Sequence, residues 1–229
     1  MAWFVPVLLL MVILTGPGLW VARVLKRYEQ PADRYRASGT GASLARHLLD
    51  GLGLCDVNVE PTAQGDHYDP RARAVRLSPR VHDGTSLTAI TVAAHEVGHA
   101  IQHARGEPWF QARDRLARVA IGADRAARLL LVAAPVLMAI TRVPLTGLLC
   151  VLTAVGAVAL GALVHLVTLP VEFDASFGKA LPLLERGRLL HPPDLPHARR
   201  ILRAAALTYV AASLGGLLNL ARWMSVLRR

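Results

Sequence analysis

The chain combines long uncharged apolar runs with one extended polar region. Residues 2–22 and 145–168 contain no Asp, Glu, Lys or Arg, and residues 204–221 form a shorter run of the same kind. An α-helix rises about 1.5 Å per residue, so these runs are close to the length that crosses a ~30 Å hydrocarbon layer. Residues 129–141 are also uncharged but reach only about 20 Å as a helix, so a span there must include the turns before it. The pattern predicts about four transmembrane helices.

The polar region, residues 23–127, has the pattern of a small α+β domain. Residues 43–49 have the apolar spacing of a short helix, whereas residues 57–59 and 74–77 alternate as β-strands do. Asp69-Pro70 between the two strands is a turn signal. This region is therefore expected to fold as a compact soluble domain.

A longer helix is predicted over residues 86–103, where apolar side chains recur at helical spacing. Asp83 or Ser86 is the expected N-cap, and Gly106 the expected stop. The whole chain is thus predicted to be mainly α-helical. Its parts are a transmembrane anchor in residues 1–22, the soluble domain in 23–127, two transmembrane helices in 128–168, a cytoplasmic segment in 169–203, and a last transmembrane helix with a tail in 204–229.

Composition favours a membrane setting over nucleic-acid binding. Of the 229 residues 53% are hydrophobic and only 5% aromatic, and the net charge is +10. The arginines cluster beside apolar runs, as they do where charge orients a membrane protein, and not among aromatic side chains. Because most Lys and Arg fall in residues 23–127 and 169–203, both segments are expected on the cytoplasmic side of a bacterial-type inner membrane. Cys55 and Cys150 are not expected to pair, which fits a reducing compartment.

The predicted 86–103 helix carries the sequence His95-Glu96-Val97-Gly98-His99. Two histidines four positions apart project from one helix face and can hold one Zn²⁺ at about 2.0–2.1 Å. Glu96 then lies beside the open coordination position, where it can move the proton of an attacking water. Gly98 permits another backbone or a substrate to approach the helix closely. The alternative is a pair of surface histidines on an amphipathic helix.

A catalytic zinc site needs a third protein ligand from elsewhere in the chain. His103 continues the same helix face but lies too far along the axis. Arg105 stands where the extended H-E-x-x-H-x-x-G-x-x-H pattern has its third histidine, which excludes that class. Glu172 is the better candidate, because an acidic residue at a membrane boundary is costly unless it is paired or liganded. The alternative is a carboxylate paired with Lys179 or a neighbouring Arg.

The chain resembles the YugP-like family of bacterial membrane zinc metallopeptidases. The resemblance rests on residues 92–102 around the H-E-x-x-H motif, on residues 169–176, and on the shorter matches at 66–70 and 206–210. It covers nearly the whole chain. It implies a zinc peptidase facing the cytoplasm, with His95 and His99 as metal ligands, Glu96 as the base and Glu172 as the third ligand.

A wider likeness is to the HtpX- and Ste24-type membrane gluzincins, which also place the third Glu just after a membrane helix. In those proteins an Asp follows that Glu by four positions and orients a zinc-binding His. Here the fourth position is Ser176, and Asp174 lies only two positions on, where a helix turns it away from the face of Glu172. Partners that orient His95 and His99 must nevertheless exist.

The expected activity is hydrolysis of peptide bonds, most readily in membrane proteins or their exposed tails. If the 74–77 strand lies at a sheet edge, it could hold an extended substrate by strand addition. Two alternatives stay open: an intramembrane protease of the site-2 type, and a membrane scaffold that keeps a structural zinc. Substrate identity and oligomeric state cannot be read from the sequence.

Overall fold

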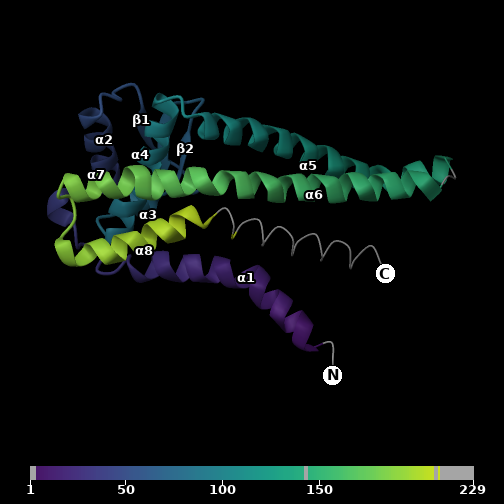
Figure 1. The fold of residues 1–229 in the computed structure, drawn as a ribbon, viewed down its shortest axis with the longest axis horizontal. Coiled ribbons are helices and arrows are strands. Elements are labelled where there is room, and N and C mark those ends of the chain that lie inside the picture. The colour runs from purple at the N-terminus through teal and green to yellow at the C-terminus, as the bar shows by residue number, and fades with distance from the viewer. Residues whose placement is uncertain (1–3, 142–143, 209–210, 212–229) are drawn as a thin grey trace.

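The computed structural model describes residues 4–141, 144–208 and 211, and its elements are nearly all helical (Figure 1). A compact base holds the short helices and the sheet, and two long helices, α5 and α6, extend from it together. The longer helices are α1 (Phe4–Arg27), α2 (Gly41–Gly51), α4 (Leu87–Ala104), α5 (Pro108–Thr141), α6 (Pro144–Phe173) and α8 (Leu195–Ala206). The shorter ones are η1 (Arg36–Ser38), α3 (Pro79–His82), η2 (Asp174–Ala180), α7 (Leu181–Arg186) and η3 (Pro192–Asp194).

The prediction of four transmembrane helices is wrong for the described part of the chain, where no helix combines the length and apolar character needed to cross a membrane. The prediction rested on runs without charge, and the absence of charge alone does not give a helix that length and apolar character. Instead, α5 and α6 pack along each other as a hairpin. The fourth predicted span, 204–221, lies largely outside the described residues.

The central element of the base is α4, whose predicted position is confirmed. Ser86 is the N-cap, because its side chain accepts a hydrogen bond from the backbone N–H of Ala89. The helix ends in a Schellman motif, in which the N–H of Glu107 donates to the carbonyl of Gln102. Gly106 takes the left-handed conformation that this ending requires, with φ of 64°. Since the turn is so short, α5 begins at once beside the end of α4.

The sheet has three short strands in the order β1–β3–β2. The predicted strands are present as β1 (Asn58–Pro61) and β3 (Ala74–Leu77), which pair in parallel. A third strand, β2 (His67–Asp69), pairs antiparallel with β3 and was not predicted, since only the turn signal at Asp69-Pro70 was recognised. The 74–77 strand is therefore central, and the idea that it binds a substrate at an open edge is wrong.

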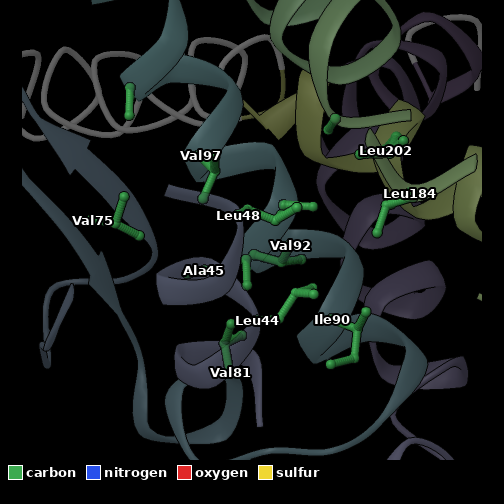
Figure 2. Packing of buried hydrophobic residues seen from close by; sticks show 14 of the residues in the cluster. Leu44, Ala45, Leu48, Val75, Val81, Ile90, Val92, Val97, Leu184 and Leu202 are labelled. Atoms are coloured by element: carbon green, nitrogen blue, oxygen red, sulfur yellow. The ribbon is translucent and has the colours of Figure 1, made fainter. Parts of the chain in front are cut away.

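One hydrophobic core joins the predicted soluble domain to the segment after α6. Leu48 of α2, Val75 of β3 and Val97 of α4 belong to the same buried cluster as Leu184 of α7 and Leu202 of α8. Figure 2 shows the side chains of α4 lying between α2 and the sheet on one side and α7 and α8 on the other. This packing holds the end of α6 against α4.

A buried ionic contact fixes the start of α8 to the loop after α1. Asp194 accepts hydrogen bonds from Nε and Nη2 of Arg34 at 2.6 and 2.7 Å, and from the hydroxyl of Tyr35 at 2.6 Å. The backbone N–H of His191 donates to the same Tyr35 hydroxyl at 3.1 Å. These bonds satisfy a carboxylate that is only 4% exposed.

Candidate metal centre

Three ligand-type side chains meet between α4 and the end of α6. Oε2 of Glu172 lies 3.2 Å from Nε2 of His95 and 3.2 Å from Nε2 of His99. The ligand atoms of the three residues all lie within 4.8 Å of one another, and all three side chains are buried. The structure thus brings together the two histidines of the motif and the acidic residue that the sequence placed 73 positions after His99.

The second ring nitrogen of His95 is held by Ser176. Nδ1 of His95 lies 3.0 Å from the Ser176 hydroxyl, and that hydroxyl donates its own proton to the carbonyl of Leu202 at 3.1 Å. Because the hydroxyl proton is used in this way, the hydroxyl oxygen accepts from Nδ1–H of His95. The proton of a neutral His95 is therefore on Nδ1, which leaves the lone pair of Nε2 facing Glu172.

Gln102 fixes the ring of His99 in the same way. Its amide nitrogen donates to the carbonyl of Val171 at 2.9 Å and to Oδ2 of Asp174 at 2.8 Å. The amide oxygen is thereby turned toward His99 and accepts from Nδ1–H at 2.9 Å. Both histidines thus present a bare Nε2 to the same point, the arrangement that partners of metal-binding histidines impose.

The donor set fits a divalent metal ion. With both Nδ1 atoms protonated, the lone pairs of two imidazole nitrogens and one carboxylate oxygen converge at short range. Such an arrangement is stable only if a cation or additional protons lie between them. Two imidazole nitrogens and a carboxylate are a ligand set that catalytic zinc takes, with a fourth position left for water. His95, His99 and Glu172 would hold the ion.

Glu172 also contacts an arginine on the other side of its carboxylate. Its side chain is fully buried, and Oε1 lies 3.1 Å from Nη2 of Arg113 on α5. Burial by itself would raise the pKa of Glu172, but the neighbouring His99, His95 and Arg113 lower it well below its usual value. The alternative partner Lys179 instead bonds Asp174 at 2.7 Å. Glu172 is thus held as a carboxylate beside the two histidines.

Glu96 lies in the same buried region and has a different protonation behaviour. Burial raises the pKa of Glu96 to about 7, and the negative charges of Glu172 and Asp66 add to this effect, while His95 and Arg113 oppose it. A carboxyl with a pKa near neutrality can both accept and return a proton.

The ligands are positioned by a close backbone contact between α4 and η2. A β-carbon added to Gly98 would lie 2.5 Å from the carbonyl oxygen of Ala175, so only glycine fits there. The close approach expected at Gly98 is therefore made by another part of the chain. The segment η2 is a π-helix, a form found frequently at functional sites. It begins two residues after Glu172, which lies at the end of α6, and it carries Ser176.

The other sequence candidates lie around the metal centre and not in it. His103 bonds the hydroxyl of Tyr68 through Nδ1 at 2.8 Å. Asp174 contacts Gln102 and Lys179, one step removed from His99. Sequence reasoning missed the contacts of Gln102 and Arg113, because neither follows a local spacing rule. Ser176 had been singled out only as the residue that replaces an expected Asp.

A groove of about 380 Å³ opens beside the centre, between α5, α6 and β2. Arg113 and Asp114 contribute charge at its wall, while most of the wall is apolar. The remaining lining residues are Tyr68, Pro70, Phe110, Ala117, Ala120, Ile121, Gly161, Val164 and Thr168. Arg113 lines the groove and also contacts Glu172, so this residue lies between the groove and the metal centre.

Comparisons with known proteins agree with this centre. The model of a family described as "Putative neutral zinc metallopeptidase" matches residues 3–228. A protein of Bacillus subtilis (strain 168), named "Putative membrane protease YugP", is 37% identical over 217 residues, which cover 92% of each chain. No solved structure matches. The chain therefore belongs to this family of neutral zinc metallopeptidases.

Proposed function

We propose that the protein is a zinc-dependent endopeptidase in which His95, His99 and Glu172 hold the metal and Glu96 moves the proton. The observation that carries the proposal is the convergence of both Nε2 atoms on Oε2 of Glu172 at 3.2 Å. Hydrogen bonds from Nδ1–H of His95 and His99 to the oxygens of Ser176 and Gln102 fix both rings with these nitrogens bare. Neither a surface histidine pair nor a simple salt bridge needs that orientation.

The chemistry divides between the metal and one carboxylate. Bound zinc polarises the scissile carbonyl and makes a water more acidic. Glu96 accepts the proton of the attacking water and delivers it to the leaving nitrogen, for which a pKa of about 7 is suited. Arg113 and Glu172 stay charged throughout, so Glu96 is the group that changes protonation state.

The substrate is an extended peptide with an apolar side chain next to the cleaved bond. The strand β2 is an edge strand, and Tyr68 from its middle lines the groove. A peptide lying along an edge strand sends alternate side chains to one face. One of these would enter the groove, whose wall is formed mostly by Ala, Ile, Val, Pro and aromatic residues.

The site of action in this proposal is a membrane surface, with membrane-associated proteins as substrates and the metal centre on the cytoplasmic side. Large apolar side chains are exposed along α5 and α6, among them Leu129, Val132, Ile140 and Leu152. Exposed apolar surface of this extent is typical of a region that contacts lipid or another protein. The printed name of the relative in Bacillus subtilis, a membrane protease, supports the same setting.

A structural zinc site in a non-enzymatic scaffold is the less favoured function. Structural zinc is normally closed by four protein ligands. Within the described residues, the group that could hold a metal has three members. Glu96, beside them, is a carboxyl poised near neutral pH. A site with three ligands and an adjacent base fits catalysis better.

The proposal is tested with purified protein, zinc analysis and cleavage of casein and of a membrane-protein tail. Glu96→Gln is expected to keep about one zinc per chain and to lose cleavage, whereas Glu172→Ala loses zinc. Glu60→Gln on β1 is the matched control, because it changes a partly exposed glutamate that pairs with Arg76 and lies outside the proposed site. This variant should keep both zinc and cleavage. Full cleavage by Glu96→Gln, or a wild-type protein that binds no zinc, would contradict the proposal.

A further inference from the structure

We infer that Arg113 is a positioning residue. Its guanidinium pairs with Oε1 of Glu172, so that the carboxylate binds the metal through Oε2 alone. The inference rests on the ligand set of the proposed function and adds a residue that the H-E-x-x-H pattern does not contain. It concerns the geometry of metal binding, and it is tested without relying on catalysis.

The two carboxylate oxygens of Glu172 have different neighbours. Oε2 lies 3.2 Å from both histidine Nε2 atoms, while Oε1 lies 3.1 Å from Nη2 of Arg113. Oε1 is buried and makes no hydrogen bond to the described residues, so its contact with Arg113 is ionic and not a directed hydrogen bond. One oxygen thus faces the metal position and the other faces a fixed cation.

Arg113 is itself held in place. Its side chain is 16% exposed, and its guanidinium carbon lies 5.9 Å from the ring centroid of Phe110. Phe110 is buried and lies beside the rings of His99 and His103. Phe110 and Arg113 lie three positions apart on α5, so they are neighbours on one face of that helix. Packing against Phe110 therefore fixes the position of the Arg113 side chain beside the metal centre.

The separation of the two oxygens matters for the chemistry. A carboxylate that binds zinc through both oxygens uses a coordination position that an attacking water needs, and a catalytic site must keep that position open. A guanidinium at Oε1 orients the carboxylate so that Oε2 faces the two histidines, and it favours binding through Oε2 alone.

The test compares Arg113→Met, Arg113→Lys and the control Arg115→Met, which removes an exposed arginine two positions along the same helix. Zinc affinity is measured by competition with a chelating dye. Arg113→Met is expected to bind zinc about 10–100-fold more weakly, the usual loss when a residue that orients a metal ligand is removed. Arg113→Lys should recover part of the loss, because it restores charge, and Arg115→Met should match the wild type.

Two further measurements separate positioning from a general effect on folding. The visible absorption of the Co²⁺-loaded protein should weaken in Arg113→Met, because cobalt absorbs less when its coordination number rises above four. In a Glu172→Gln background, Arg113→Met should change zinc affinity by less than twofold, since Arg113 acts only through that carboxylate.

Equal zinc affinity and equal Co²⁺ spectra in the wild type and Arg113→Met would overturn the inference. An equally large loss of affinity in the Glu172→Gln background would also overturn it, because Arg113 would then act by another route. A wild-type protein that binds no zinc would instead refute the proposed function on which the inference rests. The two failures are therefore distinguishable.

Discussion

Gly98 of α4 and Ala175 of η2 are in direct backbone contact. A β-carbon at Gly98 would lie 2.5 Å from the carbonyl oxygen of Ala175 and 3.1 Å from its carbonyl carbon. Backbone atoms cannot move aside as a flexible side chain can. The spacing between the helix with the histidines and the segment with Glu172 and Ser176 therefore depends on a hydrogen atom at this position.

Gly98→Ala is expected to destabilise the protein and to weaken zinc binding. In an ordinary helix this change stabilises by up to about 1 kcal/mol, but forced overpacking here costs about 1–3 kcal/mol. Thermal unfolding and zinc competition measure the two effects. Gly156→Ala in α6 is the control, because a β-carbon there meets no atom within 4 Å, and it should raise the melting temperature. A stabilised Gly98→Ala protein would contradict the contact.

Ser176→Ala is expected to lower zinc affinity by about 10–100-fold. The change removes the acceptor for Nδ1–H of His95 and the hydrogen bond from the Ser176 hydroxyl to the carbonyl of Leu202. Without that acceptor the His95 ring is free to turn or to move its proton to Nε2, the nitrogen that the metal needs. Ser43→Ala changes an exposed serine at the start of α2 and serves as the control. Unchanged affinity in Ser176→Ala would show that the ring is held by other contacts.

Gly161→Leu is expected to raise the KM for peptides with a large apolar residue beside the cleaved bond. Gly161 lines the groove, and a β-carbon there meets no atom within 4 Å, so the new side chain projects into open space. An apolar side chain excluded from such a pocket costs about 1–3 kcal/mol, which is 10–200-fold. Zinc content should not change. Gly156→Leu, equally unhindered but not among the lining residues, should leave the KM as it is.

Acid should destabilise the protein partly through Asp194. Burial raises the pKa of Asp194, but hydrogen bonds from Arg34 and Tyr35 outweigh it and bring the pKa below its usual value. A carboxyl with a lowered folded-state pKa stabilises the fold above its unfolded-state pKa of about 4. This stabilisation is lost as the pH falls through the lower folded-state pKa. Asp194→Asn should thus lower the melting temperature at pH 7 and show a shallower decline below pH 4.

The control for this pH effect is Asp50→Asn, which changes an exposed carboxylate that pairs with Arg46 one turn away. Exposed pairs of this kind contribute little to stability. The control should therefore follow the wild-type curve. If Asp194→Asn also follows it, the contact between the start of α8 and the loop after α1 does not support the fold.

Local features of this chain were predictable from sequence, because they depend on neighbouring residues. The helix of the metal-binding motif and its stop at Gly106 follow from side-chain spacing and backbone preference. The sequence left its cap between Asp83 and Ser86, of which the structure uses Ser86. The pairing of β1 with β3 around a third strand was not predictable, since sheet order depends on contacts between distant segments. A three-residue strand such as β2 is also too short for alternation to be visible.

The contacts around Glu172 show the same limit. Nothing in the spacing of Arg113 or Gln102 relative to Glu172 indicates that they meet, because the fold and not the local sequence brings α5 beside the end of α6. The transmembrane prediction failed because it used only the absence of charged residues in a run. That absence does not by itself make a helix long and apolar enough to cross a membrane, and no described helix is.

The chain between His99 and Glu172 contains the whole α5–α6 hairpin. A metal ion held by both residues ties the two ends of that hairpin together and closes a long loop in the folded chain. Loss of the ion would release the hairpin at its base, so chelation should increase hydrogen exchange in η2 and in the first turns of α5 before it affects the sheet. In the proposed site the metal would therefore stabilise the base of the hairpin as well as take part in hydrolysis.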